Sequence, residues 1–147
     1  MRVVLDTSVL ISAIRSGTGA AAEVIRLAML GNLVLLMDFK LICEYRDVAL
    51  RPEHLAASGR TAQDVETVIQ TLEAIAAPVL VEVKHRPMSQ DKNDDMILDL
   101  AINGRAHAIV TNNVRDFAAA AQSFAIQVLA PRDFLIAFRK GDFHHVD

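Results

Sequence analysis

Cysteine, proline, glycine and tryptophan are scarce in this sequence of 147 residues. The single cysteine, Cys43, excludes a disulfide framework and a zinc site built from cysteines, and it indicates a reducing compartment. Four prolines and six glycines argue against a flexible linker, and no apolar run approaches the length of a membrane span. The chain reaches a carboxylate already at Asp6, which leaves no room for the apolar stretch of a signal peptide. We therefore expect a cytoplasmic protein.

The chain also lacks an excess of basic residues, since it has 15 basic and 18 acidic residues and a net charge of −3. A general DNA-binding module is usually basic, so this class is disfavoured. The apolar fraction of 52% excludes a disordered chain and is sufficient for one core. We expect a single domain over residues 1–140, followed by a short tail at 141–147.

Short apolar segments rich in β-branched residues alternate with amphipathic segments along the whole chain. Such alternation is typical of a parallel sheet covered by helices on both faces. The fold class predicted is therefore α/β, with three α/β/α layers around a parallel sheet of about four or five strands. We expect strands at 3–5, 33–37, 78–83, 108–110 and 126–129. We expect helices at 7–14, 20–30, 38–50, 61–76, 94–103 and 131–138, and a short one from residue 117.

Ligands of open α/β sheets bind beyond the carboxyl ends of the strands. This rule selects Asp6, the segment 111–116, the pair Asp94 and Asp95 at a helix start, and Glu44 within a mostly apolar helix. Several carboxylates in one site raise one another's pKa unless a cation lies between them. Oxygen ligands without a histidine or cysteine cluster favour Mg²⁺ or Mn²⁺, ions that typically activate water against a phosphate.

Four segments of this sequence resemble, in order and spacing, the motifs of PIN-domain ribonucleases. The first is the run Val-Val-Leu-Asp-Thr-Ser-Val-Leu-Ile-Ser-Ala at 3–13. The second is Leu-Ile-Cys-Glu-Tyr at 41–45, followed by Leu-Arg-Pro at 50–52. The third and fourth are Asp-Lys-Asn-Asp-Asp-Met-Ile-Leu-Asp-Leu-Ala at 91–101 and Ile-Val-Thr-Asn-Asn-Val-Arg-Asp-Phe at 109–117.

The resemblance implies a PIN-like fold and cleavage of single-stranded RNA by water that one or two Mg²⁺ or Mn²⁺ ions activate. It further implies a VapC-like toxin of a toxin–antitoxin pair, bound by a small antitoxin and homodimeric.

The resemblance also assigns the residues of the site. Asp6, Glu44 and Asp95 match the core acids and are the expected metal ligands, with Asp94 as an alternative to its neighbour. The fourth acidic position falls on Asp116 or on the non-acidic Asn113. Ser8 is expected to hydrogen-bond a ligand carboxylate.

Simpler roles remain open for several of these residues. Asp6 alone could cap the following helix, and Glu44 could pair with Arg46 or Arg51 at the surface. A domain with a decayed site, which binds RNA or dimerises without cleaving, is the alternative function. Three further expectations concern a solvated Asp99, a buried Cys43, and Asp116 as the cap of a helix from Phe117.

Overall fold

The computed structural model describes residues 1–84 and 92–141, and it has the predicted α/β architecture. Five parallel strands form one sheet in the order β3-β2-β1-β4-β5. They are β1 (Arg2–Leu5), β2 (Val34–Met37), β3 (Ala77–Pro78), β4 (Ala108–Val110) and β5 (Gln127–Leu129). In the register of the central pair, Leu5 lies opposite Val110. The predicted parallel sheet is therefore confirmed.

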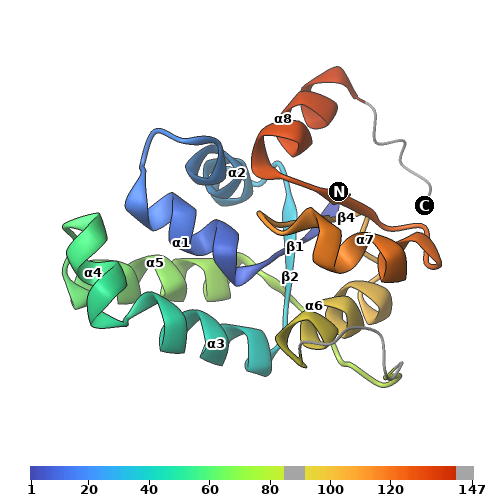
Figure 1. The fold of residues 1–147 in the computed structure, drawn as a ribbon, viewed down its shortest axis with the longest axis horizontal. Helices are drawn as coiled ribbons and strands as arrows, with labels where there is room; N and C mark the ends of the chain where they lie inside the picture. Colours follow the sequence, from blue (N-terminus) through green and yellow to red (C-terminus); the bar gives the residue numbers. More distant parts are fainter. Residues whose placement is uncertain (85–91, 142–147) are drawn as a thin grey trace.

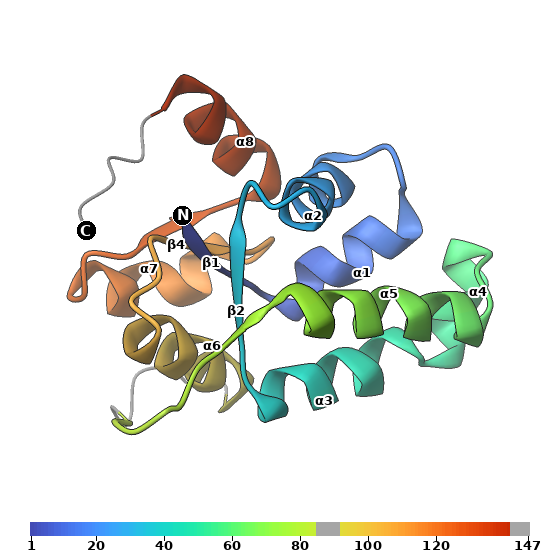
Figure 2. The ribbon, with the colours of Figure 1, turned by 180° about the vertical axis from the view of Figure 1, so that it is seen from behind.

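Eight helices are found in the described part of the chain. They are α1 (Thr7–Arg15), α2 (Ala20–Met29), α3 (Phe39–Ala49), α4 (Pro52–Ser58), α5 (Ala62–Ile75), α6 (Lys92–Asn103), α7 (Val114–Gln122) and α8 (Pro131–Lys140). Helices α1 to α5 lie on one side of β1 and β2, and α6 and α7 lie on the other (Figures 1 and 2). Between these layers residues 3–5 of β1 and all three residues of β4 are almost completely buried, as a parallel sheet covered on both faces requires. None of the eight is long and apolar enough to span a bilayer.

Local signals account for where several helices begin. The Asp38 side chain accepts a hydrogen bond from Leu41 N at 2.9 Å and thereby caps α3. Thr61 and Asp64 form a reciprocal capping box at the start of α5, in agreement with the helix expected from residue 61. Pro131 occupies the first turn of α8, where its missing N–H costs nothing.

In this half of the chain the structure contains one helix that was not predicted and one strand shorter than expected. Helix α3 ends at Ala49, close to the expected end at residue 50, and Pro52 then begins the unpredicted helix α4, which Gly59 ends at φ +68°. The strand expected at 78–83 is reduced to Ala77–Pro78. Beyond it, the backbone N–H groups of Glu82 and Val83 donate to the Asn103 side chain, both at 3.1 Å, so this segment binds the end of α6.

Of the expected tail at 141–147, only Gly141 lies within the described residues, where it ends α8 at φ +71°.

Candidate functional site

The carboxyl ends of β1 and β4 meet at the point where the strand order reverses. Strand β1 pairs with β2 on one side and with β4 on the other side, so the chain leaves β1 in one direction of the sheet and later returns to its opposite edge. The Asp6 backbone N–H donates to Val110 O at 2.9 Å, which joins the two strand ends. The sequence-based placement of Asp6 and of residues 111–116 beside each other at this switch point is therefore correct.

The Asp6 carboxylate is bound by two hydroxyls. Its Oδ2 accepts hydrogen bonds from Ser8 Oγ at 2.8 Å and from Thr111 Oγ1 at 2.7 Å. Asp6 occupies the N-cap position of α1, but its side chain makes no capping hydrogen bond. The simple capping role is thus not observed, whereas the expected contact of Ser8 with a candidate ligand is present.

The loop after β4 fixes these two hydroxyls. Asn112 N donates to Ser8 Oγ at 3.2 Å, and its side-chain amide donates to Ser12 Oγ at 2.8 Å. Asn113 N donates to Thr111 Oγ1 at 2.9 Å. Sequence reasoning included this segment but missed Thr111 as a direct partner of Asp6. A hydroxyl residue directly after a buried strand at the switch point was the available signal.

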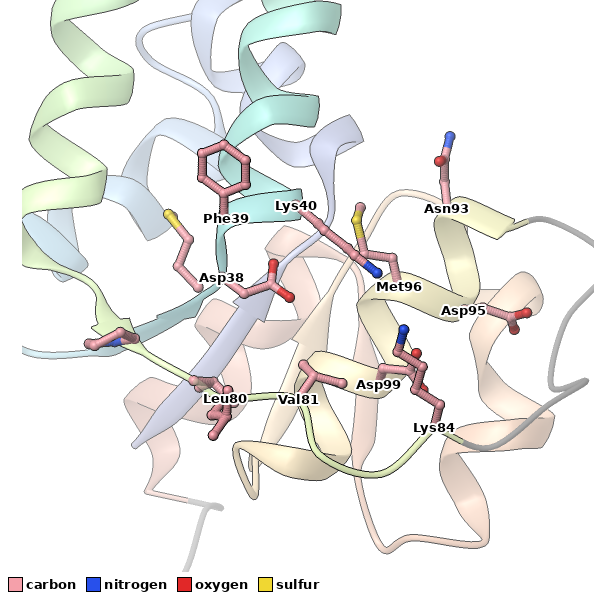
Figure 3. Close-up of a pocket in the computed structure, with 13 residues that line it drawn as sticks. Asp38, Phe39, Lys40, Leu80, Val81, Lys84, Asn93, Asp95, Met96 and Asp99 are labelled. Atoms are coloured by element: carbon pink, nitrogen blue, oxygen red, sulfur yellow. The ribbon is translucent and has the colours of Figure 1, made fainter.

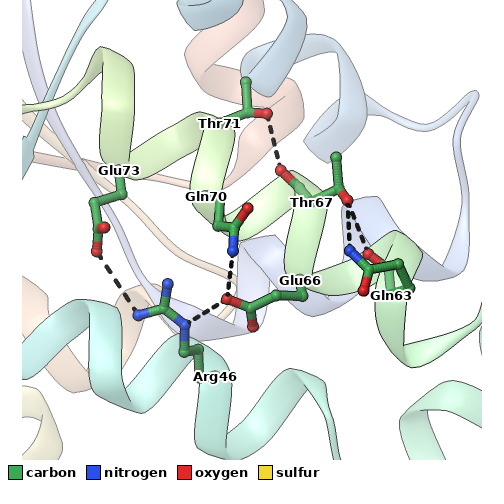
Figure 4. A network of polar contacts seen from close by, with 7 residues as sticks. All are labelled: Arg46, Gln63, Glu66, Thr67, Gln70, Thr71 and Glu73. Atoms are coloured by element: carbon green, nitrogen blue, oxygen red, sulfur yellow. Dashed lines mark hydrogen bonds and ion pairs between the residues drawn. The ribbon is translucent and has the colours of Figure 1, made fainter.

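Glu44 is connected to the same strand end through Thr7. The buried Thr7 hydroxyl donates to Glu44 Oε2 at 2.7 Å. The two arginines considered as partners of Glu44 bind other carboxylates. Arg46 contacts Glu66 at 2.9 Å and Glu73 at 3.7 Å (Figure 4), and Arg51 contacts Asp47 at 3.0 Å.

Tyr45 also joins α3 to β1. Its buried hydroxyl donates to Leu5 O at 2.6 Å, one residue before Asp6. Burial raises the pKa of Tyr45 far above its ordinary value, and the negative charges of Asp6, Glu44 and Asp38 raise it further. Three nearby carboxylates therefore act on one buried phenol. Sequence reasoning did not identify Tyr45.

Asp95 and Asp99 occupy one face of α6, one turn apart, and both are buried. The burial of Asp99 contradicts the expectation that it is solvated. Together with Asp38, Lys40 and Lys84, they line a cavity of about 1010 Å³ (Figure 3). In this view the Asp95 carboxylate points away from Asp38.

Glu44 lines a neighbouring cavity of about 570 Å³ with Asp47 and Arg51. Cys43 lines the same cavity and is exposed, so the expectation of a buried small hydrophobe at this position is wrong. Cys43 follows the buried Ile42 along α3, and the turn of the helix carries its side chain out of the core.

The remaining candidates lie at the surface. Asn113 is exposed at the N-cap position of α7, and Asp116 is exposed in its first turn. Because α7 begins at Val114, the expectation that Asp116 caps a helix from Phe117 is wrong. Asp94 is half-buried in the first turn of α6.

The donor chemistry of these residues suits a hard divalent cation, because all the candidate acids offer carboxylate oxygens. Within residues 1–84 and 92–141, however, no three histidine, cysteine or acidic side chains are grouped so that they could hold an ion. The structure brings Asp6 and Glu44 to one strand end and places Asp95 in an adjoining cavity. Metal binding would therefore require these carboxylates to approach one another.

Comparisons with known proteins agree with the observed fold. A family model described as PIN domain matches residues 2–115. A chain in the crystal structure of VapBC2 from Rickettsia felis, bound to a DNA fragment from its promoter, superposes with a TM-score of 0.60 and 14% identity. The superposition covers 87% of this chain and 97% of that chain, and at this identity it shows a shared fold. No curated protein sequence matches the chain.

Proposed function

The chain belongs to the PIN-domain family, whose members are generally nucleases, and we propose that it is a metal-dependent endoribonuclease acting on single-stranded RNA. The observation that carries the proposal is the arrangement at the end of β1. Two hydroxyls hold Asp6 there, while the adjacent Thr7 holds Glu44. Hydrogen bonds that orient a carboxylate in this way are typical of the outer partners of metal ligands, and the Asp6 side chain does not cap α1.

Each residue of the site has a distinct task in this proposal. Asp6, Glu44 and Asp95 would be the ligands of Mg²⁺ or Mn²⁺, with Asp94 next to the last of them. A bound divalent ion supplies polarisation of the phosphate and activation of water. Ser8 and Thr111 orient Asp6, and Thr7 orients Glu44. The exposed side chains of Asp116 and Asn113 would serve as outer contacts at the open side of the site.

The proposed partners follow from the structural likeness to a chain of a VapBC2 complex. We propose that the chain is the toxin of a toxin–antitoxin pair, that it acts in the cytoplasm as a homodimer, and that a small antitoxin inhibits it. A short protein encoded beside the chain is then expected to co-purify with it and to suppress RNA cleavage.

The direct test is cleavage of single-stranded RNA with Mg²⁺ or Mn²⁺. We expect Asp6→Asn and Asp95→Asn each to reduce the rate by about a hundredfold or more, because each removes a negative ligand. Asp133→Asn is a matched control, since Asp133 is exposed in the first turn of α8. Equal cleavage by all four proteins would contradict the site assignment and indicate a contaminating nuclease.

The alternative is a PIN domain that binds RNA without cleaving it, and the exposure of both Asn113 and Asp116 favours it. The same samples decide between the two functions. RNA binding by a folded protein that cleaves nothing, together with no change of unfolding temperature on adding Mn²⁺, would support the binding module.

A further inference from the structure

The first turn of α3 exposes an aromatic ring next to a cation. Phe39 is 79% exposed although it follows the helix cap Asp38 directly, and Lys40 is exposed beside it. No ion pair joins Lys40 to another side chain within residues 1–84 and 92–141. An exposed phenyl ring gains nothing from the core of its own protein, and aromatic side chains at a surface are characteristic of binding sites.

These two residues lie between the two cavities of the candidate site. The cavity of about 1010 Å³ contains Asp95, and the cavity of about 570 Å³ contains Glu44. The two cavities have four lining residues in common, which we call the shared rim: Phe39, Lys40, Asn93 and Met96. A ligand that reaches the candidate acids of both cavities must therefore cross the shared rim, which α3 and α6 form together (Figure 3).

We propose that the shared rim binds one unpaired nucleotide of the RNA substrate, with its base stacked on Phe39 and an adjacent phosphate on Lys40. This inference rests on the proposed function and assigns two residues that bind the RNA. Unpaired bases stack on exposed aromatic rings, and stacking tolerates any base because each has a π-face. The pair suits a polynucleotide because successive residues of α3 place a ring and a cation on the shared rim, and a nucleotide offers a base and a phosphate to them. The base and phosphate of one nucleotide require this combination.

Charge at this place favours an anionic ligand over an apolar one. The acids in both cavities would repel the phosphates, so a phosphate between them needs a local cation, and Lys40 provides one. A purely apolar partner would have no use for an ammonium group at the centre of its contact area. Leu80, 76% exposed in the larger cavity, extends the apolar surface on which a second base can lie.

The test measures RNA binding separately from cleavage. All variants carry Asp6→Asn, and binding of a fluorescent single-stranded RNA is followed by anisotropy at several salt concentrations. We expect Phe39→Ala to weaken binding about tenfold, whereas Phe39→Tyr keeps the ring and binds normally. We expect Lys40→Gln to reduce the slope of log K against log salt by about 0.7, because one phosphate contact is lost, and Lys40→Arg to restore it.

Leu30→Ala and Lys140→Gln are the matched controls, because both residues are exposed and lie at the end of α2 and on α8 rather than on the shared rim. Neither control should change RNA binding. Because Phe39 is largely exposed, its variants should unfold at the parent temperature, and thermal unfolding checks this.

The outcomes separate this inference from the proposed function. If Phe39→Ala binds RNA as well as the parent does, the inference is overturned. The same holds if the variant keeps RNA binding and loses binding of a protein partner. If Phe39→Ala loses RNA binding but the unchanged protein, with Asp6 intact, cleaves no RNA, the result would support the shared rim and contradict the nuclease.

Discussion

At the scale of single residues, Tyr45 links the candidate site to the stability of the fold. It is the only tyrosine in a chain without tryptophan, so its ionisation can be followed without interference from another phenol. Its hydroxyl donates to Leu5 O at 2.6 Å, and its pKa is raised first by burial and then by Asp6 and Glu44. The hydrogen bond of Tyr45 therefore positions α3 against β1, and burial together with the nearby carboxylates opposes deprotonation of its hydroxyl.

We predict that Tyr45 stays protonated in the folded protein well above pH 10, where a solvated tyrosine has its pKa. The unfolded chain then releases this proton above pH 10 while the folded chain retains it. Its contribution to stability is thus complete below this pH and decreases at higher pH, by about 1.4 kcal/mol per pH unit. Absorbance of phenolate, recorded with circular dichroism during an alkaline titration, should appear only as the protein unfolds.

Tyr45→Phe isolates this effect from the other groups that titrate at high pH. Below about pH 10 we expect the variant to lose about 1 kcal/mol of unfolding free energy, because Leu5 O loses its buried donor. At higher pH the deficit should shrink. Phenolate formation near pH 10 in a protein that remains folded would contradict the prediction.

The residue scale also shows where sequence reasoning is weakest. Asp6 and Ser8 could be selected because they follow the end of a strand, and Glu44 because it is an acid within a mostly apolar helix. Thr7 and Tyr45, which connect them, could not, because their partners lie 37 and 40 residues away in the chain. Asp99 was expected at a solvated helix surface, but α6 buries it together with Asp95, one turn away.

At the scale of elements, α3 is held on α5 by charge as well as by apolar packing (Figure 4). Arg46 Nε contacts Glu66 Oε1 at 2.9 Å, and Gln70 approaches the same oxygen at 3.4 Å. The pKa of Arg46 is raised, first because of its hydrogen bond with Glu66. Glu73 approaches at 3.7 Å and is half exposed. The contact therefore depends mainly on Glu66.

We predict that Glu66→Gln lowers the free energy of unfolding by about 0.5–1 kcal/mol at low salt, and by less at high salt because the pair is partly solvated. Urea unfolding at two ionic strengths measures this difference. Glu73→Gln is the matched control and should cost less, since its contact is longer and more exposed. Equal losses for both variants, independent of salt, would show that the pair does not act through charge.

Element boundaries were predictable where a capping signal stands in the sequence, as at Asp38 and Thr61. They were not predictable where a distant side chain competes with the sheet. The alternating valines at 79–83 favour a strand, but Asn103 binds the backbone of this segment and Pro78 lacks a donor. The end of the helix expected at residue 50 was predicted, whereas the helix that Pro52 begins was overlooked.

At the scale of the whole molecule, the topology was predictable because short buried strands alternating with helices allow few arrangements. The five-stranded parallel sheet confirms this prediction. Which acids share a site was not predictable in the same way. Chain order sets the strand at which each acid lies, but packing of α3 and α6 sets the separation between Glu44 and Asp95.

This separation makes metal binding a property of the folded molecule, and we predict that Mn²⁺ raises its stability. The proposed ligands come from the end of β1, from α3 and from α6, so the unfolded chain cannot bring them together. Mn²⁺ at about a hundred times its dissociation constant should add about 2.7 kcal/mol. For a chain of this size that corresponds to an increase of about 5–10 °C in the unfolding temperature.

Thermal unfolding with Mn²⁺, and again after removal of the ion with a chelator, measures the effect. Asp6→Asn and Asp95→Asn should each abolish most of the increase, whereas Asp133→Asn should keep it, because Asp133 is exposed on α8. An increase that survives Asp6→Asn would contradict the assignment of Asp6 and place the ion at other acids, such as the buried pair Asp95 and Asp99. Because the readout is folding rather than cleavage, it reports on the metal site even in a chain that cuts no RNA.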